Sequence, residues 1–136
     1  MASLRLEIVT PEGKTFEGEV EMVVVPGADG ELGILPMHVP LMTQLVPGEL
    51  KILKDGKETL LAVGEGFVEV TQDHISILTD MAVEENDIDE ARAQEAIDRA
   101  QAALHDKTIS GEEHATVQSV LLKSLAQIKV KRRRHL

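Results

Sequence analysis

Hydrophobic and polar residues alternate along most of the first eighty positions of the chain. Residues 4–8 place a leucine or isoleucine at every second position, with charged residues between them. This period of two is typical of a half-buried strand. A longer alternation over residues 16–24 predicts a second strand, with Val20, Met22 and Val24 on the face opposite a row of glutamates. Both segments are therefore expected to place one face in a hydrophobic core.

Turn residues divide the next part of the chain into short segments. Lys54-Asp55-Gly56-Lys57 predicts a tight β-hairpin, because Asp-Gly suits the positive φ angles of a type I′ turn. Gly64-Glu65-Gly66 is expected to break or bulge a strand, and alternation resumes at residues 68–70 and 75–77. Short strands at intervals of roughly ten residues, separated by polar turns, favour a β-sandwich or barrel.

The hydrophobic period changes to that of an α-helix from residue 87 onward. Asp87 is expected to cap the first helix, with Glu90 three residues later returning the hydrogen bond, and Ser110 and Glu113 repeat this pattern at a second helix. The predicted apolar stripes are Ala93, Ala96, Ile97, Ala100, Ala103 and Leu104 on the first helix, and Val117, Val120, Leu121, Leu125 and Ile128 on the second.

A short connector between two helices of about 18 residues predicts an antiparallel helical hairpin. An alanine-rich stripe buries little apolar area, so the hairpin is expected to be marginally stable by itself. We therefore expect it to dock on the β domain, or to open and pack on another surface.

Residues 30–48 form the least regular part of the chain. The segment combines prolines, glycines and His38 with many aliphatic residues, and it alternates too poorly for a strand and is too interrupted for a helix. We expect an apolar loop. A loop of this kind is typical of a surface that another protein covers.

Composition narrows the classes of function. The 136 residues include no cysteine, no tryptophan, no tyrosine and only two phenylalanines, so stacking platforms for sugars or single-stranded nucleic acid are not expected. No apolar run reaches the ~18–20 residues of a membrane span, and we expect a soluble chain. The net charge of −10 opposes general binding to nucleic acid or to anionic lipid.

Basic residues nevertheless gather at the end of the chain. This basic end is open to three interpretations: a solvated helix terminus favoured by the helix dipole, a contact with an acidic protein surface, or a contact with nucleic acid. The charge and the scarcity of aromatic residues favour protein over nucleic acid. The basic end consists of Lys129, Lys131, Arg132, Arg133 and Arg134.

Sequence motifs give little support for catalysis. The chain has no phosphate-binding glycine loop, and its five histidines are scattered without metal-ligand spacing. No nucleophile with a nearby base is evident, so we expect neither an enzyme nor a metal site. Asp89, Arg92 and Arg99 lie on a related side of the first helix, where an arginine pair can hold a phosphate.

At this point the chain resembles a known family over essentially its whole length. The resemblance rests on "IVTPEGKTFEGEVEMVVVPGADGELGILPMHVPLMTQLVPG", "GEGFVEV", "ILTD" and a helix starting "IDEARA". These are similar to the epsilon subunit of the bacterial and plastid F-type ATP synthase. The resemblance implies a β-sandwich of about ten short strands followed by an antiparallel two-helix hairpin. It also implies a non-catalytic subunit of the rotating central stalk.

The resemblance further implies roles for the two parts of the chain. Residues 1–84 would bind the gamma subunit and the ring of membrane c subunits, coupling proton flow to ATP synthesis, with Glu31 towards the ring and His38 near gamma. Contact with the membrane would come only through the complex, on the cytoplasmic face of a bacterial membrane or the stromal face of a thylakoid. The implied interface residues are Glu31, Leu32, Gly33, Ile34, Leu35, Pro36, Met37, His38, Pro40 and Leu41.

Residues 87–136 would form the regulatory part of such a subunit. The hairpin would fold on the β domain or extend along gamma to the alpha/beta catalytic head, where the basic end Lys129, Lys131, Arg132, Arg133 and Arg134 would contact an acidic segment and ATP hydrolysis would be inhibited.

Some members of the family bind regulatory ATP on the folded hairpin. The motif that they use matches Ile88, Asp89, Arg92 and Ala93, with Arg99 as an addition. The second helix offers only Lys123 between residues 112 and 128, whereas those members use several arginines there. Weak ATP binding and a motif retained for hairpin packing alone remain alternatives. A purely structural rotor subunit, or remotely a nucleic-acid-binding module, remains the alternative to a regulatory one.

Overall fold

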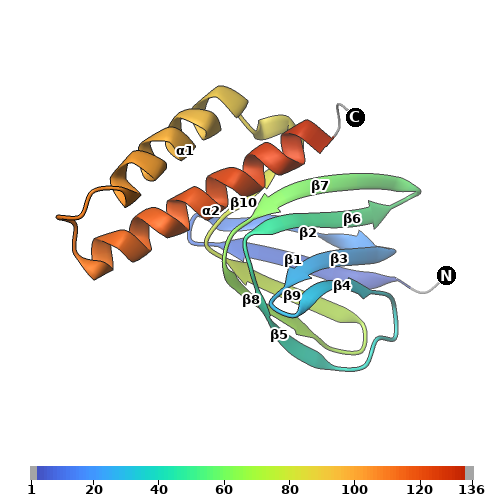
Figure 1. The fold of residues 1–136 in the computed structure, drawn as a ribbon. Helices are drawn as coiled ribbons and strands as arrows, with labels where there is room; N and C mark the ends of the chain where they lie inside the picture. The colour runs from blue at the N-terminus through green and yellow to red at the C-terminus, as the bar shows by residue number, and fades with distance from the viewer. Residues whose placement is uncertain (1–2, 134–136) are drawn as a thin grey trace.

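A computed structural model describes residues 3–133 of the chain (Figure 1). In this range ten strands are followed by a short 3₁₀ helix and two α-helices. The strands are β1 (Leu4–Thr10), β2 (Gly13–Val20), β3 (Met22–Gly27), β4 (Gly30–Ile34), β5 (Leu41–Leu45), β6 (Gly48–Lys54), β7 (Lys57–Val63), β8 (Gly66–Val70), β9 (His74–Thr79) and β10 (Ala82–Glu84). The helices are η1 (Glu85–Asp87), α1 (Glu90–Leu104) and α2 (Gly111–Arg133).

The strands form a sandwich whose two layers are joined through hydrogen bonds. The strand order is β10-β7-β6-β3-β5-β8-β9-β1-β2, and β4 lies off this path and pairs with residues 23–27 of β3. The β3–β5 junction consists of the single pair Gly27 and Leu45. Aliphatic side chains from both layers fill the interior. The predicted β-sandwich with a following two-helix hairpin is confirmed.

The chain changes layers at Glu21, where sequence alternation predicts one continuous strand. β2 ends at Val20, and β3 begins at Met22. The extra residue reverses the alternation, so Val23 and Val25 enter the core while Met22 and Val24 lie on the outer face, half-buried. The prediction that Met22 and Val24 share the core face with Val20 is therefore wrong, because a one-residue shift exchanges the two faces of a strand.

The two predicted turns have different outcomes. Asp55 and Gly56 both have positive φ angles, 52° and 75°, between the paired residues Lys54 and Lys57, so the type I′ hairpin is confirmed. The Gly64–Gly66 segment breaks the strand and connects β7 to β8 without a bulge.

Most of the irregular segment 30–48 is strand, against the expectation of a loop. β4 and β5 occupy its two ends, and only residues 35–40 between them are irregular. The alternation is hidden because Gly30, Gly33 and Gln44 lie on exposed faces next to half-buried aliphatic residues. Pairing with β3 and β8 supplies the order that the local sequence does not indicate.

The first helix begins two residues later than predicted. Asp87 belongs to the 3₁₀ helix η1, and Asp89 is the N-cap, its Oδ1 accepting a hydrogen bond from Arg92 N at 3.1 Å. The prediction that Asp87 caps the first helix is thus wrong. Of the predicted stripe, Ala93, Ile97 and Ala100 are the buried members.

The second helix is capped as predicted but buries a different set of residues. Ser110 Oγ accepts from Glu113 N at 3.1 Å. The buried positions are Ser124, Ala126, Ile128 and Val130, whereas Val120 and Leu125 are exposed by 40% and 43%. The predicted single stripe is wrong because α2 is covered on two sides. Ala126 and Val130 contact Leu60 and Ala62 of β7, while Leu121 and Ile128 contact Ala93 and Ile97 of α1.

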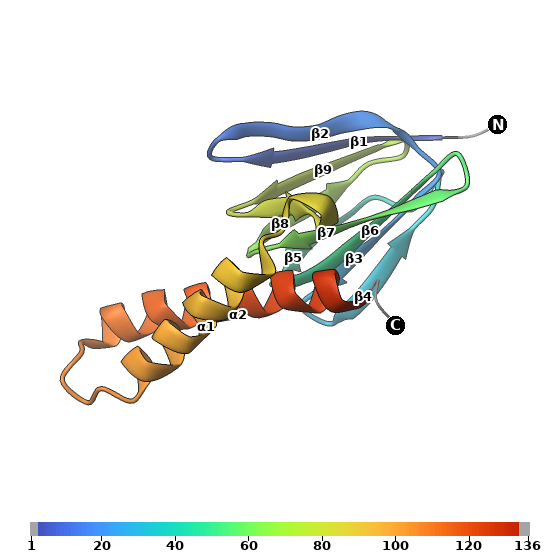
Figure 2. The same cartoon turned by 90° about the horizontal axis from the view of Figure 1, so that it is seen from above.

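The hairpin projects from one edge of the sandwich. The C-terminal half of α2 lies across β6 and β7, α1 packs along α2, and the connector between the helices lies far from the strands (Figures 1 and 2). The segment between β4 and β5 lies at the opposite end of the β domain from this connector in both views. The turn between β4 and β5 is thus well separated from the connector of the helical hairpin.

Gly66 provides a test of the packing between β8 and β9. A Cβ atom at Gly66 would lie 1.8 Å from the carbonyl oxygen of Leu78, whereas one at Gly33 would meet nothing within 4 Å. We expect Gly66→Ala to lower the free energy of unfolding by about 1–3 kcal/mol, because the backbone of β9 must move. Urea denaturation of the purified chain measures this difference. Gly33→Ala is the matched control, and equal effects of the two variants would contradict the packing argument.

Candidate interaction surfaces

The irregular residues between β4 and β5 form a tight turn. The backbone N–H of His38 donates to the carbonyl of Leu35 at 3.2 Å, with Pro36 and Met37 between them. Met37 has a φ of 68°, so the turn is of type II, with proline at its second position. Positive φ is uncommon for a residue with a large side chain and often marks a functional position.

The turn holds apolar side chains in solvent. Leu35, Met37 and Val39 are exposed by 56%, 67% and 74%. The Nδ1 of His38 donates to the carbonyl of Val39 at 2.7 Å. Three neighbouring apolar side chains with such exposure are typical of a surface that a partner covers.

A second group of exposed apolar residues lies on the outer faces of β5, β8 and β9, and sequence analysis did not identify it. Phe67 of β8 pairs directly with Leu78 of β9, and Met42 of β5 is the diagonal neighbour of Phe67. Their exposed fractions are 59%, 55% and 66%. The alternation of Val68 and Val70 toward the core is the sequence signal that could have placed Phe67 on the outer face. We call Leu35, Met37, Val39, Met42, Phe67 and Leu78 the apolar surface.

The other implied interface residues differ in how far they are accessible. Ile34 is completely buried in the sandwich core, so it supports the turn from below and exposes no area. Leu32 and Leu41 pack partly against the same core. The remaining residues of the set, Glu31, Gly33, Pro36, His38 and Pro40, lie at the surface or are half-buried.

The motif at the start of α1 lines a cavity. Four of the five implied ATP-binding residues, Asp89, Arg92, Ala93 and Arg99, surround a space of about 360 Å³ between α1, α2 and the end of the β domain. Ile88 is not among them, because it packs with the cluster that joins α2 to β7. The same cavity is also lined by Val83, Asp87, Glu95, Ala96, Ser124 and Gln127.

The charges around this cavity are mixed. Two arginines face three carboxylates, and α2 contributes a hydroxyl and an amide but no cation. Its volume falls in the range of small-molecule sites. The cavity therefore suits a nucleotide in size, but its carboxylates offset much of the attraction of the two arginines for phosphate groups.

Three of the predicted basic-end residues have partners elsewhere in the chain. Arg132 Nε lies 2.8 Å from Glu90 Oε1 of α1, and Lys131 Nζ donates to the carbonyl of Glu85 at 3.3 Å. Arg133 forms an ion pair with Glu49 of β6. These cations connect α2 to the 3₁₀ helix, to α1 and to the β domain.

The other two predicted residues of the basic end are Lys129 and Arg134. Lys129 is exposed on α2. Arg134 lies outside the described residues.

The resolved pKa shifts lie away from these surfaces. The hydrogen bond from Lys14 Nζ lowers the pKa of Glu17, and the same bond, with a second to Glu7, raises the pKa of Lys14 on strand β2. Hydrogen bonds from the hydroxyl and backbone of Thr108 lower the pKa of Asp106 in the helix connector. These are exposed contacts that order a strand edge and a loop.

Two further features bear on the class of protein. Within residues 3–133, no three histidine, aspartate or glutamate side chains converge as a possible metal site. Over the same range, neither helix combines the length and the apolar character needed to cross a membrane.

Comparison with known proteins covers nearly the whole chain. Residues 3–85 match the β-sandwich domain of the ATP synthase delta/epsilon chain, and residues 86–132 match its long α-helix domain. An ATP synthase epsilon chain from Dehalococcoides mccartyi is 45% identical, and the match covers 99% of this chain and 98% of that protein.

Solved structures share the fold at lower identity. A chain in the cryo-EM structure of the Euglena gracilis mitochondrial ATP synthase, comprising OSCP, F1 and c-ring, has a TM-score of 0.78 and 22% identity, covering 93% of this chain and 79% of that one. A chain of the Tetrahymena thermophila mitochondrial ATP synthase central stalk and c-ring has a TM-score of 0.58 and 16% identity, covering 91% and 96%.

A ten-stranded sandwich that carries a docked helical hairpin and presents an apolar turn at its far end defines a class of small two-part subunit. The chain belongs to the ATP synthase delta/epsilon chain family. The resemblance inferred from "GELGILPMHVPL" and the other quoted segments is confirmed.

Proposed function

We propose that this chain is a non-catalytic subunit of the rotating central stalk of a proton-translocating ATP synthase. The observation that carries the proposal is the apolar surface, held in solvent by the type II turn and the outer faces of β5, β8 and β9. Chains of similar fold occur in structures that contain an ATP synthase c-ring and central stalk, which supports this assignment.

The apolar surface is the proposed site of contact with the gamma subunit and the c-ring. Met42, Phe67 and Leu78 offer gamma a broad apolar sheet face, and the turn carrying Met37 and His38 leads into β5, the strand of Met42. Glu31, on the adjoining strand β4, offers the ring a polar contact. Apolar centres with polar rims are typical of stable protein interfaces.

The proposed coupling is mechanical. Rotation of the c-ring, driven by ion flow, acts on this chain and on gamma as one body, and gamma transmits the torque to the catalytic head. The chain needs no reacting groups for this role. It needs a rigid surface in contact with both gamma and the c-ring, and a hydrogen-bonded sandwich provides such a surface.

Loss of one apolar side chain should weaken binding to gamma. We expect Phe67→Ser to raise the dissociation constant for a cognate gamma subunit about 10- to 100-fold, because roughly 1.5–3 kcal/mol of apolar burial is lost. Calorimetric titration measures the change. Lys57→Ser, at an exposed position of the β6–β7 hairpin outside the apolar surface, is the control. Failure of the unmodified chain to bind gamma contradicts the proposed function, and equal binding by both variants contradicts the surface.

We further propose that residues 87–136 inhibit ATP hydrolysis by leaving the β domain. The apolar clusters that hold the hairpin are small and rich in alanine, and Val120, Leu122 and Leu125 of α2 remain exposed. A hairpin of this kind has apolar area to offer a second surface. Extended along gamma, it would place the basic end against an acidic segment of the alpha/beta head.

Removal of the hairpin tests this regulatory proposal. We expect an enzyme assembled with a chain truncated before Asp87 to hydrolyse ATP severalfold faster than one assembled with the full chain, because the inhibitory contact is lost. Steady-state hydrolysis measures the difference. The truncated chain must bind gamma like the full chain, which controls for loss of fold. An unchanged rate in that case rejects inhibition by residues 87–136.

A third proposal concerns regulatory ATP. We propose that the cavity lined by Asp89, Arg92 and Arg99 binds ATP weakly, since two arginines face it and its volume suits a nucleotide. The three carboxylates around it oppose the phosphates. Retention of the motif for capping and packing alone is the competing explanation, because Asp89 caps α1 and Ile88 packs against β7.

Titration of the isolated chain with ATP separates the two explanations. We expect weak binding that Arg92→Ala reduces about tenfold or more, because a charge-assisted contact is lost. Arg5→Ala on β1 removes the same charge far from the cavity and should leave binding unchanged. No detectable binding, or equal loss in both variants, favours a packing role.

The proposed partners place the chain at a membrane only through the complex. It would lie peripherally on the cytoplasmic face of a bacterial membrane or the stromal face of a thylakoid. We propose no nucleic-acid partner, since Lys131, Arg132 and Arg133 are engaged within the chain.

A further inference from the structure

Strand β6 carries a buried carboxylate beneath the end of α2. The Glu49 side chain is only 7% exposed, although it lies on the outer face of its sheet. Its Oε2 is buried and has no hydrogen-bond partner among residues 3–133. Burial of an ionised carboxylate is costly unless a cation compensates it.

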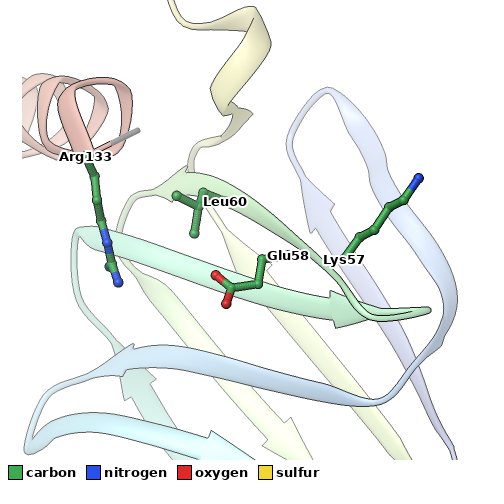
Figure 3. A pocket seen from close by; sticks show the side chains of 4 residues that line it. All are labelled: Lys57, Glu58, Leu60 and Arg133. Carbon is green, nitrogen blue, oxygen red and sulfur yellow. The ribbon is translucent and has the colours of Figure 1, made fainter. Parts of the chain in front are cut away.

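Arg133 at the end of α2 supplies that cation. Its Nη1 pairs with Oε1 of Glu49, across 84 positions of the sequence. Figure 3 shows the Arg133 side chain reaching from α2 toward the sheet, beside Leu60 and Glu58. The nearest other cation along β6, Lys51, pairs with Glu58 at 3.8 Å. The pair therefore joins the last described residue of the hairpin directly to the β domain.

The apolar contact beside this pair is modest. Ala126 and Val130 of α2 meet Leu60 and Ala62 of β7, with Ile88 at the edge. Two of its five buried residues are alanines, and Met81 and Val83 pack against it only partly buried, so the apolar area that holds the helix is modest. An ion pair at the same junction consequently has a large share in the balance between a docked and an undocked α2.

We propose that Arg133 keeps α2 docked because it compensates the buried carboxylate of Glu49. This inference rests on the proposed regulatory role of the hairpin and identifies the contact that opposes it. While α2 is docked, Arg133 is paired with Glu49 of the same chain. Any acidic partner of the basic end must compete with Glu49 for this guanidinium, so docking and partner binding exclude each other at Arg133.

The two members of the pair are unequally buried, which makes the proposal testable. Arg133 is 48% exposed and Glu49 is 7% exposed. Removing the arginine leaves a buried carboxylate without compensation, whereas removing the carboxylate leaves an arginine that water already solvates. Neutralising Arg133 alone should therefore undock α2 more than neutralising Glu49, and neutralising both should suppress the effect.

The chain contains no cysteine, so a single introduced thiol can report undocking. Ala126 is 5% exposed and faces β7, whereas Ala93 is 5% exposed and faces α2 from α1. The thiol of Ala126→Cys becomes reactive when α2 leaves the sheet. The thiol of Ala93→Cys becomes reactive when the two helices separate. Alkylation rates of the full chain then distinguish the two motions.

We expect Arg133→Gln to speed alkylation of the Ala126→Cys variant about tenfold or more and to affect the Ala93→Cys variant much less. Addition of Glu49→Gln to Arg133→Gln should return the rate toward that of Glu49→Gln alone. Arg132→Gln is the matched control, since Arg132 pairs with an exposed carboxylate on α1, and it should change the rate less than about twofold.

Two results would overturn the proposal. One is equal alkylation rates in Arg133→Gln and Arg132→Gln. The other is a double variant that reacts as fast as Arg133→Gln. Because the isolated chain is used, the result is independent of the assembled enzyme. If the alkylation rates follow the expected order but truncation leaves ATP hydrolysis unchanged, the docking contact is supported and the proposed inhibition is rejected. If the alkylation rates do not follow that order but truncation raises ATP hydrolysis, the docking contact is rejected and the proposed inhibition is supported.

Discussion

Helix α2 has to be covered on two sides, and the arrangement of the whole C-terminal region follows from this requirement. Along its C-terminal half, every second residue from Ser124 to Val130 is buried, a spacing that does not fit a single helical stripe. Positions 124 and 128 face α1 while positions 126 and 130 face β7, each pair one turn apart. Helix α1 packs on α2 and makes few direct contacts with the β domain. The orientation of α1, the shape of the cavity at its start and the partners of the basic end therefore all depend on one helix lying on one sheet face.

Turns and helix caps could be predicted where a few neighbouring residues determine them. The type I′ turn at Asp55-Gly56 needs positive φ angles that few residues other than these adopt, and Ser110 provides a cap for α2 within three residues. The layer change at Glu21 could not be predicted, because alternation continues through it without an interruption in composition. Asp87 and Asp89 are equally good caps in sequence, and the choice between them depends on Ile88 packing against β7.

The candidate surfaces divide in the same way. The unusual composition of residues 35–40 indicates an interface directly, because apolar side chains occur where turn residues prevail. The alternation of Val68 and Val70 could have placed Phe67 on the outer face, but it does not indicate that this face is exposed, since a strand with apolar residues on both faces is also typical of a buried strand. Glu49 is the extreme case: on an exposed sheet face it would be an ordinary glutamate, and its burial arises only from a helix about eighty residues later.

The type II turn at Met37 also has a mechanical consequence. A short turn between two hydrogen-bonded strands has few soft degrees of freedom, and its backbone is fixed before any partner arrives. A force applied at Met37 passes within two or three residues into β4 and β5, and from there into β3 and β8 through their hydrogen-bond ladders. Such an element deforms little under load. In a rotating assembly it would act as a stiff joint, so elastic twist would be stored elsewhere, in longer and less cross-linked parts of the shaft.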